Sequence, residues 1–245
     1  MPWPRGGRRL RKTAAMSTTL QSSSAAELVR APLFVDVVSD VVCPWCYVGK
    51  RKLETALARW RADQPDVAAT VRWHPFELNP DLPVEGIPRT AYLEQKFGGK
   101  ARAVEIYTRV RAVGAEVGIP FDFDRISRQP NTREAHRLIA WAQQHGDAGA
   151  LVERLFRAYF IEGRWIGARD ELAALAAGSG LPDDEARAML ASDAYRAEVE
   201  AEYREAQEAG ITGVPFFIFN GRTAVSGAHD PDVLLEAIAA ARADA

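Results

Sequence analysis

Two cysteines constrain this chain more than any other feature, because they are the only two in 245 residues and occupy positions 43 and 46. Residues 33–38, Leu-Phe-Val-Asp-Val-Val, precede them, and this β-branched and aromatic run predicts a buried strand. After them, apolar residues recur at helical spacing as far as Trp60. The segment Cys43-Pro44-Trp45-Cys46 is therefore predicted to lie at a strand-to-helix junction, in the first turn of the helix. The charged residues of this helix are expected mostly on the face opposite its apolar residues: Lys50, Arg51, Lys52, Glu54, Arg59 and Arg61.

The first turn of a helix favours a thiolate, because its backbone N–H groups have no partner within the helix and the helix dipole adds positive potential there. Cys43, at the helix start, is therefore predicted to be the nucleophile. Cys46 lies one turn further on the same side of the helix, so it can bond to Cys43 with little backbone movement. It is predicted to be the resolving thiol. Pro44 has no N–H to lose and presets φ for the helix start, while Trp45 carries no titrating group.

Two structural uses of a cysteine pair fit the sequence less well. A structural zinc site needs four ligands, and the histidines that the chain adds, His74, His136, His145 and His229, are not at the spacing of a zinc finger. A permanent disulfide between residues three apart closes almost no loop and would add little stability. A redox-active pair without a metal is therefore favoured.

The charge of the chain is small but uneven. A net charge of −2 and a pI near 6.1 give no reason to expect a nucleic acid as partner. Residues 1–31 are basic and rich in Arg, Ser, Ala and Gly without hydrophobic periodicity, so we expect a disordered tail. Met16 is an alternative start of the protein, which would remove most of this basic segment.

The same tail bears on where the protein works. Arg8-Arg9 suggests a twin-arginine export signal, but no apolar segment of the length that a signal needs follows it. No stretch of the chain approaches the length of a transmembrane helix, so no membrane is expected as a partner. We therefore expect a cytoplasmic protein. Because persistent disulfides are rare in that compartment, the cysteine pair is expected to cycle between its two redox states.

The order of predicted elements suggests one interrupted sheet. Residues 67–74 alternate apolar and polar as a strand does, whereas residues 89–210 are almost wholly helical in pattern. Strand patterns return at 214–219 and 223–225, joined by the tight-turn signal Asn220-Gly221 and followed by a helix from Pro231. This order predicts an α/β fold with a mixed sheet. The expected parts are a tail at 1–31, sheet segments at 32–80 and 211–245, and a helical insertion domain at 81–210.

Three stretches in this order resemble the DsbA family, and more narrowly its FrnE-like subgroup. They are Val38-Ser39-Asp40-Val41-Val42-Cys43-Pro44-Trp45-Cys46-Tyr47, His74-Pro75-Phe76-Glu77-Leu78-Asn79-Pro80 and Thr212-Gly213-Val214-Pro215-Phe216-Phe217. The resemblance covers roughly residues 32–243. It implies a thioredoxin-like fold with a large inserted all-helical domain.

The resemblance also implies roles at the second of the two sheet segments. Pro215 would be a cis-proline that faces the active-site disulfide, and Val214 would offer its backbone to an extended substrate. The alternative is an ordinary trans-proline at the start of a strand. Substrate contacts are expected from Pro44, Trp45 and Val214.

Other residues near the cysteines are weaker candidates. Asp36 is expected to lie buried beneath Cys46 and to accept its proton, which would require a raised pKa; a capping or solvated role is as plausible for it and for Asp40. Histidines 74, 136 and 229 are candidates for approaching the site, although a lone histidine is more often structural. An apolar rim for substrate is suggested for Trp45, Trp73 and Phe76, with core packing the favoured role for Trp73.

These features together predict a protein thiol-disulfide oxidoreductase that works through a mixed disulfide. No resident cofactor is expected beyond the Cys43–Cys46 disulfide, although glutathione is a candidate co-substrate. With no second cysteine pair, the site needs an external redox partner for recycling. A homodimer is compatible with the sequence, and the direction of the reaction depends on a reduction potential that the sequence does not give.

Two alternatives belong to different classes of protein. The first is a glutathione-dependent transferase or isomerase, because kappa-class glutathione transferases and 2-hydroxychromene-2-carboxylate isomerases share the architecture. Those proteins typically carry serine at the position of Cys43 and lack the second cysteine. The second is a non-catalytic holdase whose helical domain binds unfolded chains, and it predicts that activity survives the loss of both cysteines.

Overall fold

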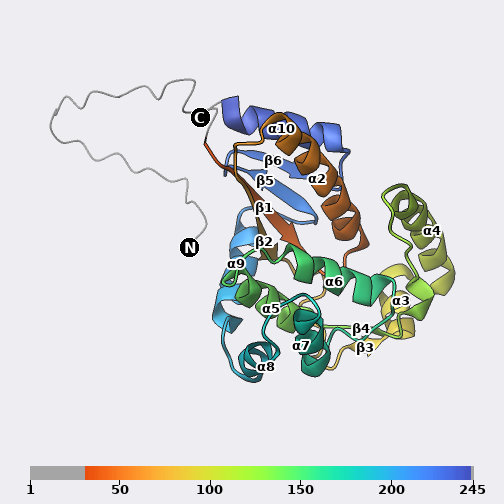
Figure 1. Cartoon of the computed structure of the whole chain (residues 1–245). Helices are drawn as coiled ribbons and strands as arrows, with labels where there is room; N and C mark the ends of the chain where they lie inside the picture. Colours follow the sequence, from red (N-terminus) through yellow and green to blue (C-terminus); the bar gives the residue numbers. More distant parts are fainter. Residues whose placement is uncertain (1–30, 244–245) are drawn as a thin grey trace, which may run out of the picture.

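The computed structural model describes residues 31–243, so the expected tail lies almost entirely outside the described residues. Its centre is a four-stranded mixed sheet in the order β2-β1-β5-β6 (Figure 1). Strand β1 (Leu33–Ser39) runs parallel to β2 (Ala69–Pro75) and antiparallel to β5 (Phe216–Phe219). Strand β6 (Thr223–Ser226) closes the hairpin with β5 at one edge.

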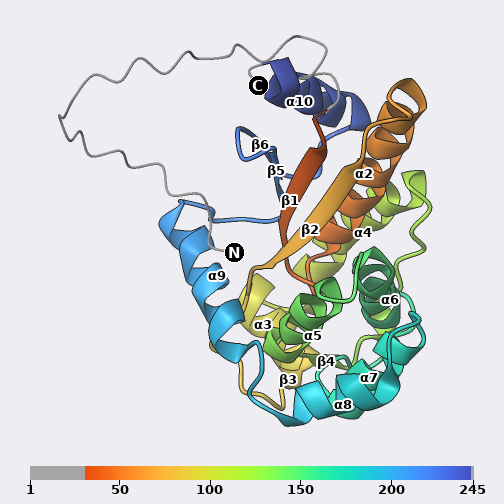
Figure 2. The ribbon, with the colours of Figure 1, turned by 60° about the vertical axis from the view of Figure 1, so that its left-hand side comes forward.

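Helices cover both faces of this sheet. Helix α2 (Pro44–Asp63) and helix α10 (Pro231–Ala243) pack together against one face, where Val35 and Val37 join their apolar side chains in the main core. Helix α9 (Arg196–Glu208) contacts β2 on the other side, as Figure 2 shows. Side chains alternate between the two faces of a strand, so every second residue of β1 faces α2, the cysteine helix.

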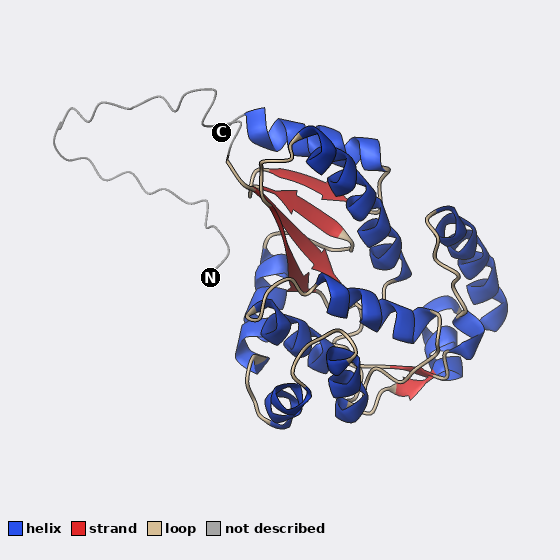
Figure 3. Ribbon diagram, in the orientation of Figure 1, coloured by secondary structure: helices blue, strands red, loops and turns tan. Residues whose placement is uncertain are grey.

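The chain between β2 and β5 forms the helical insertion that the sequence predicts, and the fold is the thioredoxin-like α/β fold expected (Figure 3). A small two-stranded sheet within it, β3 (Ile87–Pro88) with β4 (Arg128–Gln129), was not predicted, because two-residue strands carry no periodicity. No helix in residues 31–243 is long and apolar enough to cross a membrane. The helices of the insertion before α9 are α3 (Arg89–Phe97), α4 (Lys100–Glu116), a 3₁₀ turn (Phe123–Arg125), α5 (Arg133–Gln143), α6 (Gly149–Phe160), α7 (Arg169–Ala177) and α8 (Asp183–Ala191).

One side chain of α2 departs from the predicted amphipathic pattern. Lys50 is buried rather than on an open polar face, with a side-chain exposure of 3%. Its ammonium group lies 2.9 Å from Glu153 of α6 and also pairs with Glu54. The phenol of Tyr47 donates to the same Glu153 carboxylate at 2.7 Å. Helix α6 thus covers part of the charged face of α2 and couples the insertion to the cysteine helix, which helical periodicity alone does not show.

A buried arginine fastens α5 to the connection between α8 and α9. The guanidinium of Arg137, which is fully buried, donates to the backbone carbonyls of Met189, Ser192 and Ala194 at 2.6–3.1 Å. It also donates to both carboxylate oxygens of Glu134, at 2.9 and 2.8 Å. Met189 lies in the last turn of α8, and Ser192 and Ala194 follow that helix, so this one side chain binds carbonyls on both sides of the helix end.

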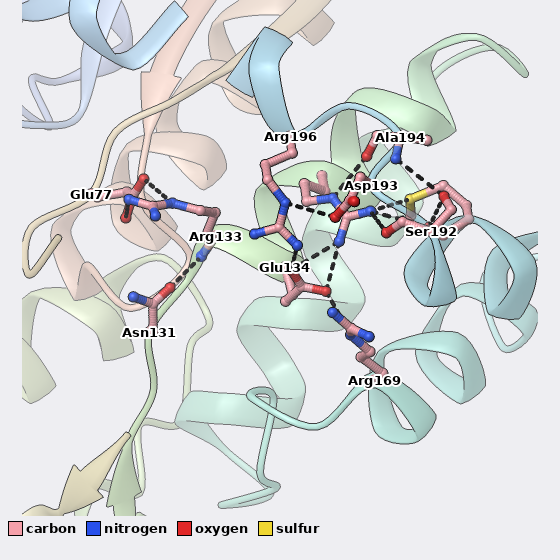
Figure 4. A network of polar contacts seen from close by, with 11 residues as sticks. Glu77, Asn131, Arg133, Glu134, Arg169, Ser192, Asp193, Ala194 and Arg196 are labelled. Atoms are coloured by element: carbon pink, nitrogen blue, oxygen red, sulfur yellow. Dashed lines mark hydrogen bonds and ion pairs between the residues drawn. The ribbon is translucent and has the colours of Figure 1, made fainter. Parts of the chain in front are cut away.

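The carboxylate of Glu134 has further basic neighbours. Arg169 donates to it at 2.9 Å, and Arg196 lies 3.9 Å away (Figure 4). Nearby, Arg133 holds the buried carboxylate of Glu77 through two contacts of 3.2 Å. These ion pairs connect α5 to the loop after β2, to α7 and to α9.

Candidate active site

The two cysteines lie where the sequence places them. Cys43 is the extended residue that precedes α2, with φ −91° and ψ 112°, and Pro44 is the first residue of the helix. The amide of Cys46 donates to the carbonyl of Cys43 at 3.0 Å, so the pair spans the first turn. Both are free thiols. Cys43 therefore lies at the positive end of the helix dipole, as predicted.

The loop before β5 brings a second segment against Cys43. The thiol of Cys43 donates to the carbonyl oxygen of Val214 at 3.6 Å, although the two residues are 171 positions apart in the chain. The Val214–Pro215 peptide bond is cis. The amide of Gly227 in turn donates to the carbonyl of Pro215 at 2.8 Å, which ties this loop to the segment after β6. The structure thus places the backbone next to Pro215 directly beside the nucleophile candidate.

Gly49 is a site residue that sequence reasoning missed. A Cβ atom at this position of α2 would lie 2.8 Å from Cγ of Pro215 and 3.0 Å from Cζ of Phe217. Real Cβ atoms do not approach so closely, so only glycine lets the cysteine helix pack on the Val214–Pro215 loop. A glycine inside a helix lowers its stability, so its presence there indicates a packing or functional reason. This was the signal in the sequence that could have revealed Gly49.

We expect Gly49→Ala to weaken both activity and stability. The added methyl group meets a rigid proline ring, so α2 and the Val214–Pro215 loop have to separate, at a cost of about 1–3 kcal/mol. Urea unfolding and the rate of disulfide reduction measure the two effects. The matched control is Gly178→Ala, where a Cβ meets nothing closer than 3.4 Å at ordinary helical φ. Equal midpoints and equal rates for the two variants would contradict this account of the packing.

Cys46 lies in a closed environment. Its exposed fraction is 1%, compared with 5% for Cys43. Burial raises the pKa of the Cys46 thiol well above its usual value, since the charged form loses its solvation. The neighbouring sulfur of Cys43 raises this pKa further, whereas the side chain of Ser39 and the backbone of Asp40 oppose the rise. A neutral, protonated Cys46 behind a more accessible Cys43 is the arrangement that a resolving thiol needs.

The structure contradicts the prediction for Asp36. Its carboxylate bonds to Arg72 and His74, with 2.9 Å to a nitrogen of each side chain, and these contacts lower its pKa despite partial burial. Its neighbours Val35 and Val37 point to the α2 face, so by alternation Asp36 points to the opposite face of the sheet. Asp36 is therefore an ion-pair partner and not a proton acceptor beneath Cys46. A charged residue inside an apolar strand does not reveal from sequence which face it occupies.

His74 is the partner of Asp36 on that far face. Its imidazole lies 2.9 Å from Asp36 and 3.1 Å from Glu202 of α9. The two carboxylates outweigh the opposing effect of burial and raise the pKa of His74 to about 9. His74 is therefore charged at neutral pH and links β2 to α9.

Asp40 and His136 do meet next to the cysteine loop. Asp40 is fully buried and accepts hydrogen bonds from the amides of Val42, at 3.4 Å, and Leu78, at 2.8 Å. It therefore caps the turn before Cys43, which was one of its expected roles. Nε2 of His136 lies 3.5 Å from the same carboxylate and 3.1 Å from the carbonyl oxygen of Phe76.

The remaining candidates are distributed differently from the predicted rim. Trp73 and Phe76 are buried core residues, whereas Trp45 is half-buried at the start of α2. His229 lies beside Gly227, in the segment that holds Pro215, and His145 pairs with Glu185. Within residues 31–243, no group of three or more potential ligands is arranged to hold a metal ion.

A thioredoxin fold interrupted by helices, with a CxxC pair at the start of its first sheet-packed helix, defines the class of thiol-disulfide oxidoreductases and their relatives. Residues 34–239 match the DSBA-like thioredoxin domain, and the chain belongs to this family. The chain is 31% identical over 209 residues to the uncharacterized protein YwbO of Bacillus subtilis. This match covers 83% of this chain and 94% of YwbO.

Solved structures show the same fold. A probable DsbA oxidoreductase from Streptomyces coelicolor is 34% identical and superposes with a TM-score of 0.76, over 87% of this chain and 91% of that one. The cytosolic disulfide reductase DsbM of Pseudomonas aeruginosa, solved with GSH, is 23% identical and superposes with a TM-score of 0.54. The match covers 86% of this chain and 96% of DsbM. A 2-hydroxychromene-2-carboxylate isomerase is 18% identical and superposes with a TM-score of 0.59. The match covers 84% of this chain and 93% of the isomerase. The latter two likenesses concern the fold alone.

Proposed function

We propose that this protein is a thiol-disulfide oxidoreductase in which Cys43 is the nucleophile and Cys46 the resolving thiol. One observation carries the proposal. The thiol of Cys43 lies at the start of α2 and 3.6 Å from the carbonyl of Val214, with Cys46 buried one turn behind it. The nucleophile, the resolving thiol and an edge of backbone for an extended substrate thus meet at one point.

In the reducing direction, the Cys43 thiolate attacks a sulfur of the substrate disulfide, and the first substrate sulfur leaves as a thiolate. Cys46 then attacks Cys43 in the mixed disulfide, which forms the Cys43–Cys46 bond and releases the second substrate sulfur. Running the steps backwards oxidises a substrate dithiol. The more the thiolate of the attacking cysteine is stabilised, the stronger an oxidant such a protein is. We propose the cytoplasm as its location and an external thiol, such as glutathione, as its recycling partner.

A redox titration tests this proposal and shows its direction. The protein is equilibrated in glutathione redox buffers, and the state of the two thiols is read by alkylation and mass. We expect one reversible two-electron transition in the wild type and none in Cys46→Ser, which should instead accumulate a mixed disulfide at Cys43. Absence of an intramolecular disulfide at every buffer ratio would refute the proposal.

The alternative of a glutathione-dependent transferase or isomerase has support from the fold of the 2-hydroxychromene-2-carboxylate isomerase. It gives Cys46 no task, although Cys46 is buried one turn behind Cys43. It therefore predicts that Cys46→Ser retains full turnover. The holdase alternative predicts that suppression of aggregation persists when both cysteines are replaced by serine. Turnover of Cys46→Ser and aggregation suppression by the double variant together distinguish the oxidoreductase, the transferase or isomerase, and the holdase.

A further inference from the structure

Strand β2 forms one edge of the four-stranded sheet. Its parallel pairing with β1 turns the N–H and C=O groups of every second residue of β2 away from the sheet. The amide of Leu33 donates to the carbonyl of Ala68, which fixes the alternation. The residues directed outward are therefore Ala69, Val71 and Trp73, and they present the donors and acceptors of a strand along this edge.

The outward groups of Trp73 are already bound by a side chain. The Trp73 amide donates to Oε1 of Gln143 at 2.6 Å, and Nε2 of Gln143 donates to the Trp73 carbonyl at 3.1 Å. The amide of Gln143, at the end of α5, thus makes the pair of bonds that a residue of an adjacent antiparallel strand would make. Within residues 31–243, no group bonds to the outward N–H and C=O of Ala69 and Val71. The edge therefore holds one amide group and has two further positions open.

These open positions face a groove of about 510 Å³, the edge groove. Residues 69–72 of β2 line it along the strand, and Arg61 of α2 and Glu198 of α9 belong to its walls. The volume is typical of protein ligand sites, which hold roughly 300–1,000 Å³. Ala69 and Val71 are two residues apart, the spacing at which an extended chain presents its own backbone groups to a neighbour. The edge groove therefore fits one extended polypeptide strand.

Unpaired charges at the two ends of the edge groove define the chemistry of that strand. Arg61 lies in the last turn of α2, which leads into the start of β2. Glu198 lies one helical turn before Glu202, the partner of His74 near the other end of β2 (Figure 2). Neither Arg61 nor Glu198 forms an ion pair with another described residue. An extended strand with an acidic side chain at one end and a basic one about four residues away complements both charges.

We propose that the edge groove binds an extended segment of a polypeptide substrate, which joins β2 as an added strand through the backbone of Ala69 and Val71. This inference rests on the proposed function and assigns the site a second contact for protein disulfides. Strand β1 separates β2 from β5 and from the Val214–Pro215 loop beside Cys43. A polypeptide is long enough to contact both places, whereas a small disulfide contacts Cys43 alone.

Peptide binding to the ¹⁵N-labelled protein, followed by NMR, tests the groove directly. The probe is the acetylated and amidated pentapeptide Glu-Thr-Val-Thr-Lys. We expect it to shift the amide signals of Ala69 and Val71 and, at saturation, to slow their hydrogen exchange by at least about tenfold. The same peptide with every backbone nitrogen methylated has no N–H donors and should bind at least about fivefold more weakly. Equal affinities of the two peptides, or no shift at Ala69 and Val71, would overturn the inference.

A charge reversal in the wall of the edge groove should switch its preference. Glu198→Lys makes both ends basic, so Glu-Thr-Val-Thr-Lys should bind about three- to fivefold more weakly, and Glu-Thr-Val-Thr-Glu more tightly by a similar factor. Glu200→Lys is the matched control, because Glu200 pairs with Arg204 on the same helix and does not line the groove. It should keep the wild-type preference. The same order of affinities in Glu198→Lys as in the wild type would contradict the assigned occupant.

Steady-state kinetics connect the edge groove to thiol exchange. Val71→Pro removes the outward N–H and leaves the pairing with β1, since that N–H does not point to β1. We expect the KM for insulin to rise about fivefold with kcat unchanged, while reduction of 5,5′-dithiobis(2-nitrobenzoate) stays within about twofold of wild type. Val71→Thr retains the N–H and should match the wild type. An unchanged KM for insulin in Val71→Pro would overturn the inference.

The set of experiments also separates this inference from the proposed function. If Val71→Pro does not fold, Glu198→Lys, at an exposed position, decides the same question through the KM for insulin and the peptide preference. A wild-type protein that reduces neither insulin nor 5,5′-dithiobis(2-nitrobenzoate) would refute the proposed function itself. Normal reduction of both by a protein that binds neither peptide would refute the edge groove alone.

Discussion

Replacing Cys43 by serine is expected to abolish disulfide reduction, with a loss of at least about 10³-fold in turnover. A serine hydroxyl is a weak nucleophile at neutral pH unless an adjacent general base activates it. The oxygen would take the place of a sulfur that lies 3.6 Å from the carbonyl oxygen of Val214. Steady-state reduction of a disulfide substrate by an external thiol measures the loss.

Cys46→Ser is the matched control for this experiment. It should also fail to turn over, but it should still form the mixed disulfide at Cys43, because the nucleophile is intact. The thiol of Cys46 acts only after that step, and its burial keeps it from attacking substrate first. Turnover by Cys43→Ser at more than a few per cent of the wild-type rate would remove Cys43 from the mechanism and favour a function that does not use thiol exchange.

Arg137→Met is expected to cost about 2–5 kcal/mol in the free energy of unfolding, because each buried carbonyl left unpaired costs about 1–3 kcal/mol. Methionine fills much of the volume but leaves the carbonyls of Met189, Ser192 and Ala194 without the donor that Arg137 supplies. The carboxylate of Glu134 retains Arg169 at 2.9 Å, so the loss comes mainly from the carbonyls. Urea denaturation followed by circular dichroism measures the change.

An exposed arginine of the same domain provides the comparison. Arg187 pairs with Asp170 and Asp183 on the surface of α8, where solvent screens both contacts. Arg187→Met should leave the urea midpoint close to that of the wild type. If Arg137→Met unfolds at the same urea concentration as Arg187→Met, the Arg137 contacts contribute little and the connection between α8 and α9 is held by apolar packing.

Much of the candidate site could be predicted because its chemistry is local in sequence. The strand before Cys43, the proline at the first helical position and the three-residue spacing to Cys46 each depend on neighbours a few positions away. The Val214–Pro215 loop was placed against Cys43 by resemblance to a family and not by periodicity, and the structure brings the two within 3.6 Å. Gly49 was missed because its role is visible only when Pro215 is beside it.

The errors share one physical cause. Asp36 was placed beneath Cys46 because it is close in sequence, yet the alternation of β1 turns its carboxylate to the opposite face, where Arg72 and His74 hold it. Lys50 was placed on an open polar face, yet α6 covers it and supplies Glu153 as its partner. In both cases the environment of a charged group depends on elements that are distant in the chain.

The sequence by itself determined the class of fold, the redox pair and the order of strand, helix and insertion, because hydrophobic periodicity and cysteine spacing are local properties. Only the tertiary structure decided which polar groups surround Cys46. Cys43, Ser39 from β1 and the backbone of Asp40 act on the thiol of Cys46, and the Asp40 carboxylate in turn meets His136 of α5, about a hundred positions further along the chain. A buried thiol titrates according to its neighbours in space, and these are set by packing between elements that no local pattern connects.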